Sequence, residues 1–233
     1  MTAQGSLFSR LLGLVTRLNS TTAPTQREVD RRMLDVLYAD FDRKVDALAL
    51  GLDRGTVTVG QFTGAMPSLI RQHQLAAAVI ASGGADQVTP QTMALAQRQV
   101  DTQLAYFERW KAELLQQAVD GKLPSAEAIA ARAKLYGRAA KTTAEQTSTA
   151  ALGVPPLPWY VGQGSPCRVN CKCRWDIEVL DVVNANFDCY WYVNEEAEHC
   201  PVCVMRSRVA NPLRVRRGRI VDPERYQAAG LFV

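Results

Sequence analysis

The sequence predicts a mainly α-helical protein that ends in a small β-hairpin module stapled by zinc. Before residue 150, apolar residues recur at helical spacing between capping signals. After it, the chain is rich in Pro, Gly, Cys and aromatic residues and has short alternating runs. Five of the six cysteines also fall in two tight clusters near the C-terminal end. We therefore expect a helical bundle, or an extended set of antiparallel helices, followed by a metal-stabilised hairpin.

Length and composition are consistent with a folded chain that has several distinct segments. The chain has 233 residues, of which 47% are hydrophobic and 21% are charged, so it has enough apolar material for a buried core. We expect an amphipathic docking segment at 1–24, a helical domain at 25–150, a proline-rich linker at 151–166, a cysteine-rich module at 167–205 and a basic tail at 206–233.

The predicted docking segment makes a poor signal peptide, because it has no positively charged n-region and no small-residue cleavage site. No apolar run in the chain approaches the roughly 20 residues of a membrane span, and we expect no membrane contact. The amphipathic stretch from Ser6 to Leu18 is expected to place its apolar face on a partner. The expected setting is a reducing cytosol, where clustered cysteines indicate metal binding rather than disulfides.

The first predicted helix covers residues 25–52. Thr25 and Glu28 have the spacing of a capping box, and Gly51 and Gly55 mark the end of the helix. Its apolar face is formed by Val29, Met33, Leu37, Phe41, Val45 and Leu48.

The second helix is predicted to start at Thr58, which has Gln61 three residues later. Pro67 is expected to break or kink this helix, and Gly83-Gly84 to close it. His73 lies alone on the helix, and we interpret it as a surface or half-buried histidine rather than a ligand. The apolar positions are Phe62, Met66, Leu69, Ile70 and Ala77.

Two more helices follow in the helical region. Thr89-Pro90 predicts an N-cap and first residue for a third helix that runs to Gly121. Ser125 predicts the cap of a fourth helix, which we expect to fade in the Thr/Ser-rich stretch 142–149. The apolar positions of the two helices are Met93, Val100, Leu104, Phe107, Leu114, Ile129, Leu135 and Tyr136.

The C-terminal part is predicted to be extended. Three prolines within four residues favour a polyproline-like segment over 151–164, whose aromatic residues predict that it lies along another surface. From Cys171 the pattern alternates, so residues 171, 173, 175, 177 and 179 share one strand face. Asn184-Ala185-Asn186 predicts a turn, after which residues 187–193 pair back as a hairpin. Cys189 on the second strand is expected to be a buried core thiol.

The cysteine spacing predicts a structural zinc site. Cys200-Pro-Val-Cys203 forms a turn that brings two thiolates to one ion, and Cys167, Cys171 and Cys173 compete to complete the tetrahedron. Five thiols for four positions leave one spare, and the spacing does not decide which of the three earlier cysteines it is. His199 is expected to point away from the ion. Zinc would stabilise so small a hairpin, because binding free energy becomes folding free energy.

The same residues argue against catalysis. Catalytic zinc sites are usually rich in histidine and keep an open position, but this chain has only two histidines. It contains no Gly-rich phosphate loop ending in Lys-Ser/Thr, no His-Glu-x-x-His and no Gly-x-Ser-x-Gly elbow. We therefore expect no enzymatic activity.

The C-terminal tail is basic. Seven arginines lie between Arg206 and Arg225, against only Asp222 and Glu224. Such a tail either meets phosphate or an acidic protein surface, or is simply solvated and partly flexible. The candidate contact residues are Arg206, Arg208, Arg214, Arg216, Arg217 and Arg219.

Four stretches, which together cover roughly residues 60–205, resemble one protein family. They are Ala81-Ser-Gly-Gly84 followed by Thr89-Pro90, Gln103-Leu-Ala-Tyr-Phe107, Arg132-Ala-Lys-Leu-Tyr-Gly-Arg-Ala139, and Leu157-Pro158 leading to Cys167, Asn170-Cys171-Lys-Cys173-Arg-Trp175 and Glu198-His199-Cys200-Pro-Val-Cys203. The family is that of the minor head, or head-morphogenesis, proteins of tailed bacteriophages and prophages, typified by the Mu-type F protein. The cysteine pattern after a proline-rich segment is the specific part of the resemblance.

The resemblance implies a structural virion protein, oligomeric in the head or connector and present in the host cytoplasm during assembly. Its implied partners are the portal, the major capsid protein or packaged DNA, and it implies no catalytic residues. One alternative is a zinc-dependent nucleic-acid-binding protein that stacks bases on Tyr190, Trp191 and Tyr192, although these rings are expected to pack the hairpin. The other is a hydrolase that uses the cysteine cluster.

Overall fold

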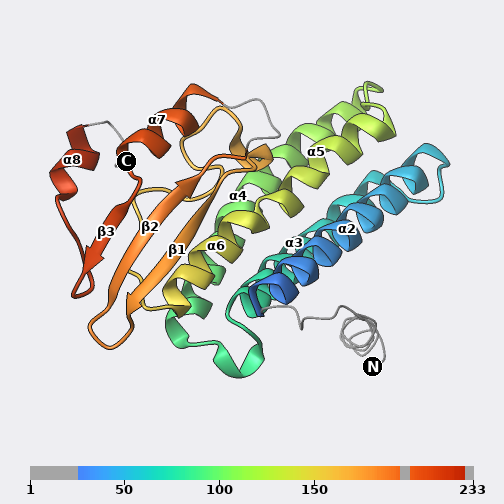
Figure 1. The fold of residues 1–233 in the computed structure, drawn as a ribbon. Helices are drawn as coiled ribbons and strands as arrows, with labels where there is room; N and C mark the ends of the chain where they lie inside the picture. Colours follow the sequence, from blue (N-terminus) through green and yellow to red (C-terminus); the bar gives the residue numbers. More distant parts are fainter. Residues whose placement is uncertain (1–25, 195–199, 229–233) are drawn as a thin grey trace, which may run out of the picture.

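The computed structural model describes residues 26–194 and 200–228, and in these residues the fold is mainly helical with a small antiparallel sheet (Figure 1). The helical part consists of α2 (Gln26–Asp53), α3 (Val59–Ala81), η1 (Ala85–Gln87), α4 (Pro90–Val119), α5 (Ala126–Arg138) and α6 (Ala140–Ala151). The C-terminal part consists of η2 (Arg168–Asn170), β1 (Arg174–Asp181), β2 (Asn186–Tyr192), α7 (Pro201–Val209), β3 (Leu213–Arg216), β4 (Arg219–Ile220) and α8 (Pro223–Ala228). The predicted fold class is confirmed. The predicted docking segment 1–24, the Thr25 cap and His199 lie outside the described residues.

The start of α3 is the capping box that the sequence predicts. The hydroxyl of Thr58 accepts the N–H of Gln61 at 3.1 Å, and the Gln61 side chain accepts the N–H of Thr58 at 2.8 Å. At the other end, Gly83 and Gly84 have φ angles of 88° and 122°, which close the helix as expected. Pro67 does not break α3. The helix continues because its buried apolar face extends on both sides of the proline.

The later helix starts are also confirmed, but the predicted end of the helical region is wrong. Thr89 and Ser125 cap α4 and α5, and Pro90 is the first residue of α4. The stretch 142–149 does not fade, because it forms most of α6. Ala140 and Ala144 of α6 pack against a small apolar cluster from α2 and α3. This burial outweighs the weak helix propensity of Thr and Ser.

The helical core contains most of the predicted apolar positions. The largest buried cluster in this part consists of Phe41, Val45, Ala49, Phe62, Met66, Ile70, Phe107, Trp110, Leu114, Ile129, Ala130, Ala133 and Tyr136. Met93 and Leu135 were predicted inward but are 41% and 37% exposed. They adjoin the buried Thr92 and Tyr136, at the edges of the buried stripes of α4 and α5.

His73 is not the surface or half-buried residue that the sequence suggests, because only 4% of it is exposed. Its ring lies 4.7 Å from that of Phe41 and 5.6 Å from that of Tyr38, and its Nε2 is 3.2 Å from the carbonyl oxygen of Gly137. Burial lowers the pKa of His73 to about 4. The histidine is therefore a neutral core residue that joins α3 to α2 and α5.

The C-terminal sheet has the strand order β1-β2-β3-β4, all antiparallel. Trp175 faces Trp191 and Ile177 faces Cys189, so the predicted hairpin and its inward face are confirmed. Val179 is 38% exposed instead of buried, because the β1–β2 register shifts between Val179 and Asp181 and the strand leaves the core there.

The predicted basic tail is folded rather than loose in the described residues. Residues 213–220 add β3 and β4 to the hairpin, and α7 and α8 flank them. Leu213 and Val215 are fully buried, as is Ala210. The apolar residues between the arginines pack into the core and fix this segment there. A count of charges alone does not reveal them.

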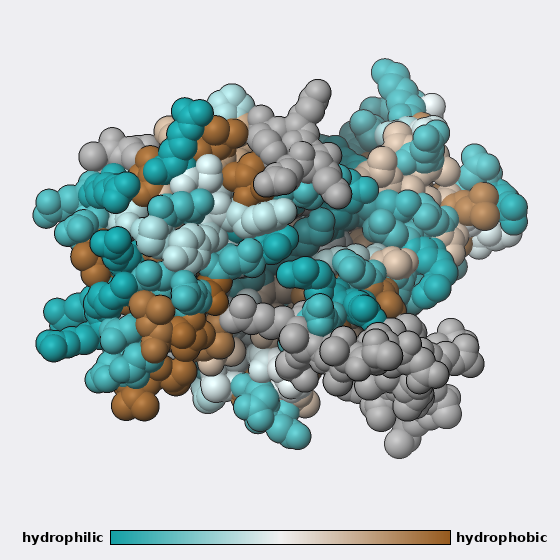
Figure 2. Space-filling model, viewed as in Figure 1, coloured by the Kyte–Doolittle hydropathy of each residue, from teal (hydrophilic) through white to brown (hydrophobic). Residues whose placement is uncertain are grey.

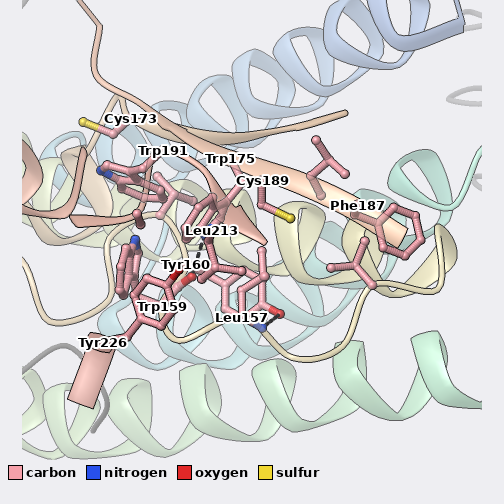
Figure 3. Packing of buried hydrophobic residues seen from close by; sticks show 14 of the residues in the cluster. Leu157, Trp159, Tyr160, Cys173, Trp175, Phe187, Cys189, Trp191, Leu213 and Tyr226 are labelled. Carbon is pink, nitrogen blue, oxygen red and sulfur yellow. Dashed lines mark hydrogen bonds between the residues drawn. The ribbon is translucent and has the colours of Figure 1, made fainter. Parts of the chain in front are cut away.

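The proline-rich segment forms one wall of the core of the C-terminal module (Figure 3). Trp159 stacks on Trp175 with a ring-centroid distance of 5.2 Å, and the indole N–H of Trp175 donates to the carbonyl of Trp159 at 2.8 Å. Trp191 packs edge-on against both rings. The segment therefore lies along another surface, as expected, and that surface is the sheet.

One carboxylate ties the module to the helices. Glu145 of α6 accepts the backbone N–H of Val161 and, at 2.7 Å, that of Trp175. Burial raises the pKa of Glu145 to about 8, and the two N–H donors oppose this rise. In Figure 1, α6 lies beside β1. In the part of the chain that the structure describes, no helix has the length and apolarity needed to cross a membrane.

Candidate metal centre

The Cys200–Cys203 turn is the first turn of α7. Cys200 is the N-cap residue, Pro201 is the first helical residue, and the N–H of Cys203 donates to the Sγ of Cys200 at 3.4 Å. Proline suits this position because its φ angle is set for a helix and its missing N–H would have no partner there. The two thiols are three residues apart, so they lie on the same side of the helix start.

The other pair of thiols precedes β1. Cys171 ends the short η2 turn, where its N–H donates to the carbonyl of Arg168 at 3.1 Å. From Cys171 the backbone is extended toward β1, so Cys171 and Cys173 share one face of the chain. Figure 3 shows the Sγ of Cys173 pointing away from the aromatic cluster, toward the edge of the module.

Three of these thiols meet. The Sγ atoms of Cys171, Cys173 and Cys203 all lie within 4.8 Å of one another, and those of Cys171 and Cys203 are 3.8 Å apart. The three residues are buried, with exposed fractions of 2%, 7% and 1%. A tetrahedron with Zn–S bonds of about 2.3 Å has S···S edges of about 3.8 Å. A disulfide needs about 2.05 Å, and all six cysteines are free. The group therefore has the size of a metal site.

The thiols are electrostatically coupled. Hydrogen bonds from the thiols of Cys173 and Cys203 lower the pKa of Cys171 to about 2. The pKa of Cys173 is raised to about 11, mainly because its thiol donates to Cys171, and the pKa of Cys203 is raised for the same reason. The group thus favours one thiolate with two thiol donors around it, an arrangement that a metal ion can replace by binding all three sulfurs.

Cys200 follows the triad in the chain of thiols. Its Sγ accepts the N–H of Cys203 at 3.4 Å, and interactions with Cys203 and Cys167 lower its pKa against the effect of burial. Cys167 is only partly buried, and its own thiol–thiol hydrogen bond is with Cys200. The thiols thus form a chain from the buried triad through Cys200 to Cys167 at the outside. The structure thus brings three of the five predicted ligands together, Cys171, Cys173 and Cys203, and places the partly buried Cys200 and Cys167 outside this triad.

Cys189 behaves as predicted. It is fully buried within the core of the module, where Figure 3 shows it among apolar side chains and apart from Cys173. Burial raises the pKa of its thiol to about 12, so it stays protonated.

Sequence reasoning missed the role of Arg206. This residue was grouped with the basic tail, but only 4% of it is exposed. Its guanidinium carbon lies 4.9 Å from the ring centre of Trp159 and 5.9 Å from that of Trp191. Within residues 26–194 and 200–228, its Nε and Nη1 have no hydrogen-bond partner. The signal that could have found it is spacing, because Arg206 follows Cys203 by three residues, as Cys203 follows Cys200.

The remaining predicted contact arginines divide into two groups. Arg216 is fixed to β2, since it donates to the carbonyl of Phe187 at 2.8 Å and pairs with Asp188 at 2.7 Å. The exposed ones are Arg208, Arg214, Arg217 and Arg219. Trp191, one of the three aromatic residues considered for base stacking, is fully buried. It therefore has no exposed ring face on which a base could stack.

A groove of about 420 Å³ opens beside the thiols, between α2, α6 and β1. Its lining includes Asp35, Lys141 and Glu145 as well as Cys171 and Cys173. Burial lowers the pKa of Lys141, which lies 5.9 Å from the ring centre of Tyr38. The groove gives the thiol cluster an approach from solvent, which a metal site requires. Comparison with protein-family models, curated proteins and solved structures finds no match to this chain.

Proposed function

We propose that this chain is a structural minor head protein of a tailed bacteriophage or prophage, and that one structural zinc ion holds its C-terminal module together. The observation that carries the proposal is the buried triad of Cys171, Cys173 and Cys203. These thiols belong to the cysteine pattern that resembles the family. They lie in a module whose core includes the proline-rich segment of the same resemblance.

The chemistry of the donor set favours zinc in a closed site. Buried thiolates in a tetrahedral arrangement are typical of structural zinc, whereas catalytic sites keep a position open. We assign Cys171, Cys173, Cys200 and Cys203 as the four ligands and leave Cys167 outside the tetrahedron. The ion then joins the chain before β1 to the first turn of α7, two segments separated by the whole β1–β2 hairpin.

An assembly role is supported by an apolar surface at the far end of the module. Four residues at the end of the β1–β2 hairpin are exposed: Val179 by 38%, Leu180 by 49%, Val182 by 69% and Val183 by 94%. Figure 2 shows this patch in brown at the lower left, where the hairpin ends in Figure 1. Contiguous exposed apolar residues of this kind mark protein contacts. We propose that this hairpin tip contacts the portal or the major capsid protein.

The zinc part of the proposal is tested by metal analysis of the purified chain. We expect one zinc per chain, lost together with thermal stability in Cys171→Ser and Cys203→Ser. The variants Cys167→Ser and Cys189→Ala should keep the metal. A wild-type chain that is folded without bound metal contradicts the proposal, and loss of zinc in Cys167→Ser contradicts the ligand set.

The assembly part is tested by copurification of this chain with the portal and major capsid proteins of a tailed phage. We expect Val183→Asp to weaken the association. The control is Val119→Asp, which places the same change on an 82% exposed valine at the end of α4. A chain that stays monomeric, with no affinity for portal or capsid, would contradict the proposal.

Nucleic-acid binding is the second candidate, and the four exposed arginines of the C-terminal part favour it. They are expected to contact phosphate, so binding would weaken steeply with salt. Replacing Arg208, Arg214, Arg217 and Arg219 by alanine should abolish such binding without loss of zinc. DNA affinity that survives this change would point to another surface.

A further inference from the structure

Helix α7 carries a cationic group, Arg206, one turn after Cys203. Cys200 caps the helix, Cys203 follows one turn later, and Arg206 follows after three more residues. Residues three apart lie next to each other on a helix surface. The arginine is therefore placed beside the thiol cluster by the helix that carries half of the proposed ligands.

Arg206 is buried in an unusual way. Its guanidinium is held over Trp159 of the proline-rich segment and near Trp191 of β2. Two of its three nitrogens, Nε and Nη1, are buried without a hydrogen-bond partner, and among the described residues no carboxylate forms an ion pair with it. A buried charge is costly unless an opposite charge lies close by. The two indole rings contribute a cation–π attraction but carry no net charge.

Among the described residues, the nearby groups that can carry negative charge are the cysteines. Burial lowers the pKa of Arg206, and the thiolate charges of Cys203, Cys171, Cys200 and Cys173 act in the opposite direction. They comprise the buried triad and Cys200, the four residues that we assign as ligands.

The charge of the loaded site explains why a cation is needed there. When four thiols bind Zn²⁺, they form a tetrathiolate complex and release four protons. Fewer protons are released if one of the sulfurs is already a thiolate. The complex carries two net negative charges inside the protein, because four thiolates outweigh one divalent ion. One arginine next to the complex reduces the net charge of the site from two negative charges to one.

We propose that Arg206 is the built-in counter-charge of the metal centre, a positioning residue that favours the four thiolates and so strengthens metal binding. The inference rests on the proposed zinc site and deepens it. In the metal-loaded protein the guanidinium faces a dianionic complex. In the metal-free protein, with most thiols protonated, the same guanidinium is a buried charge with little compensation. Arg206 thus stabilises the loaded form and destabilises the empty form.

The test compares Arg206→Met with Arg208→Met in the full chain. Methionine keeps an unbranched apolar stem against the indole rings but removes the charge. Arg208 is exposed on the same helix and serves as the matched control. Zinc affinity is measured by competition with a chromophoric chelator, and stability by urea unfolding with and without zinc. We expect Arg206→Met to bind zinc at least tenfold more weakly, while its zinc-free form is as stable as wild type or more stable. Arg208→Met should match wild type in both measurements.

The outcomes separate this inference from the zinc proposal. Absence of zinc in the wild-type chain overturns the zinc proposal itself. If wild type binds zinc, and Arg206→Met binds it equally well but is less stable with and without zinc, then Arg206 only packs against the tryptophans and the inference is wrong.

If Arg206→Met does not fold, Arg206→Lys decides the matter, since it keeps the charge and loses the planar stacking. Zinc affinity near wild type in that variant supports a charge role, and a tenfold loss overturns it. Cobalt substitution gives a second readout, because loss of the nearby charge should shift the thiolate-to-cobalt absorption band in Arg206→Met but not in Arg208→Met.

Discussion

Two helical glycines should respond in opposite ways to the same substitution. Gly137 of α5 lies against α2, and a Cβ added there would be 2.4 Å from Cδ1 and 2.8 Å from Cε1 of Phe41. Gly64 of α3 is exposed, and a Cβ added there would meet nothing within 4 Å. Both glycines are inside helices, so alanine improves helix propensity by about 1 kcal/mol at each position.

The packing cost differs between the two sites. Carbon atoms in contact are normally about 3.5–4.0 Å apart, so Gly137→Ala requires Phe41 or the helices to move by roughly 1 Å. The ring cannot swing away easily, because it is 2% exposed and lies against the ring of His73. Overpacking of a well-packed core costs about 1–3 kcal/mol, and a shift this large belongs near the upper end. We expect Gly137→Ala to lose about 2 kcal/mol and Gly64→Ala to gain about 1 kcal/mol.

The assay is urea unfolding followed by far-ultraviolet circular dichroism, with zinc held in excess so that the metal centre does not contribute to the difference. The expected separation between the variants is about 3 kcal/mol, well above the uncertainty of linear extrapolation. A Gly137→Ala protein as stable as wild type would refute the close approach of α5 to α2. A destabilised Gly64→Ala protein would refute the exposed position of that glycine.

Two further predictions concern buried polar groups. Burial lowers the pKa of His73 from 6.5 to about 4, so the unfolded chain binds the proton first and stability should fall as pH drops from about 6.5 to about 4. The loss is at most about 3 kcal/mol, at about 1.4 kcal/mol per pH unit, and urea unfolding at several pH values should show a shallower fall in His73→Gln. Glu145→Ala leaves the N–H groups of Val161 and Trp175 without their acceptor, which should cost about 2–4 kcal/mol by the same assay. Glu108→Ala, which removes an exposed ion pair on α4, should change stability by less than about 1 kcal/mol.

Local signals in the sequence predicted much of the fold. Thr58 and Thr89 cap helices because their hydroxyls satisfy the free N–H groups of the first turn, and this depends only on nearby residues. The alternating residues from Cys171 to Ile177 face inward because the period of a strand is two. The cysteine spacing likewise predicted a strand approach for Cys171 and Cys173 and a turn for Cys200 and Cys203, but not that this turn begins helix α7.

The features that the sequence did not predict depend on contacts between distant segments. Helix α6 is rich in Thr and Ser, but its buried Thr143 bonds Gln74 of α3, and no local rule contains that partner. The sequence places Arg206 in a charged tail because six other arginines follow it within 19 residues. Only the fold shows that Trp159 and Trp191, 47 and 15 residues earlier in the chain, enclose it.

These contacts also explain why the metal centre and the fold of the module are expected to depend on each other. The proline-rich segment contributes Trp159, the sheet contributes Trp191, and α7 contributes both Arg206 and two of the thiols. If the thiols lose the ion, the arginine over the two indole rings loses the charge that compensates it. The least costly relief is for α7 to move so that the arginine reaches water, which would expose the rings as well. Metal loss should therefore loosen the proline-rich segment, the sheet and α7 together, rather than only the two cysteine pairs.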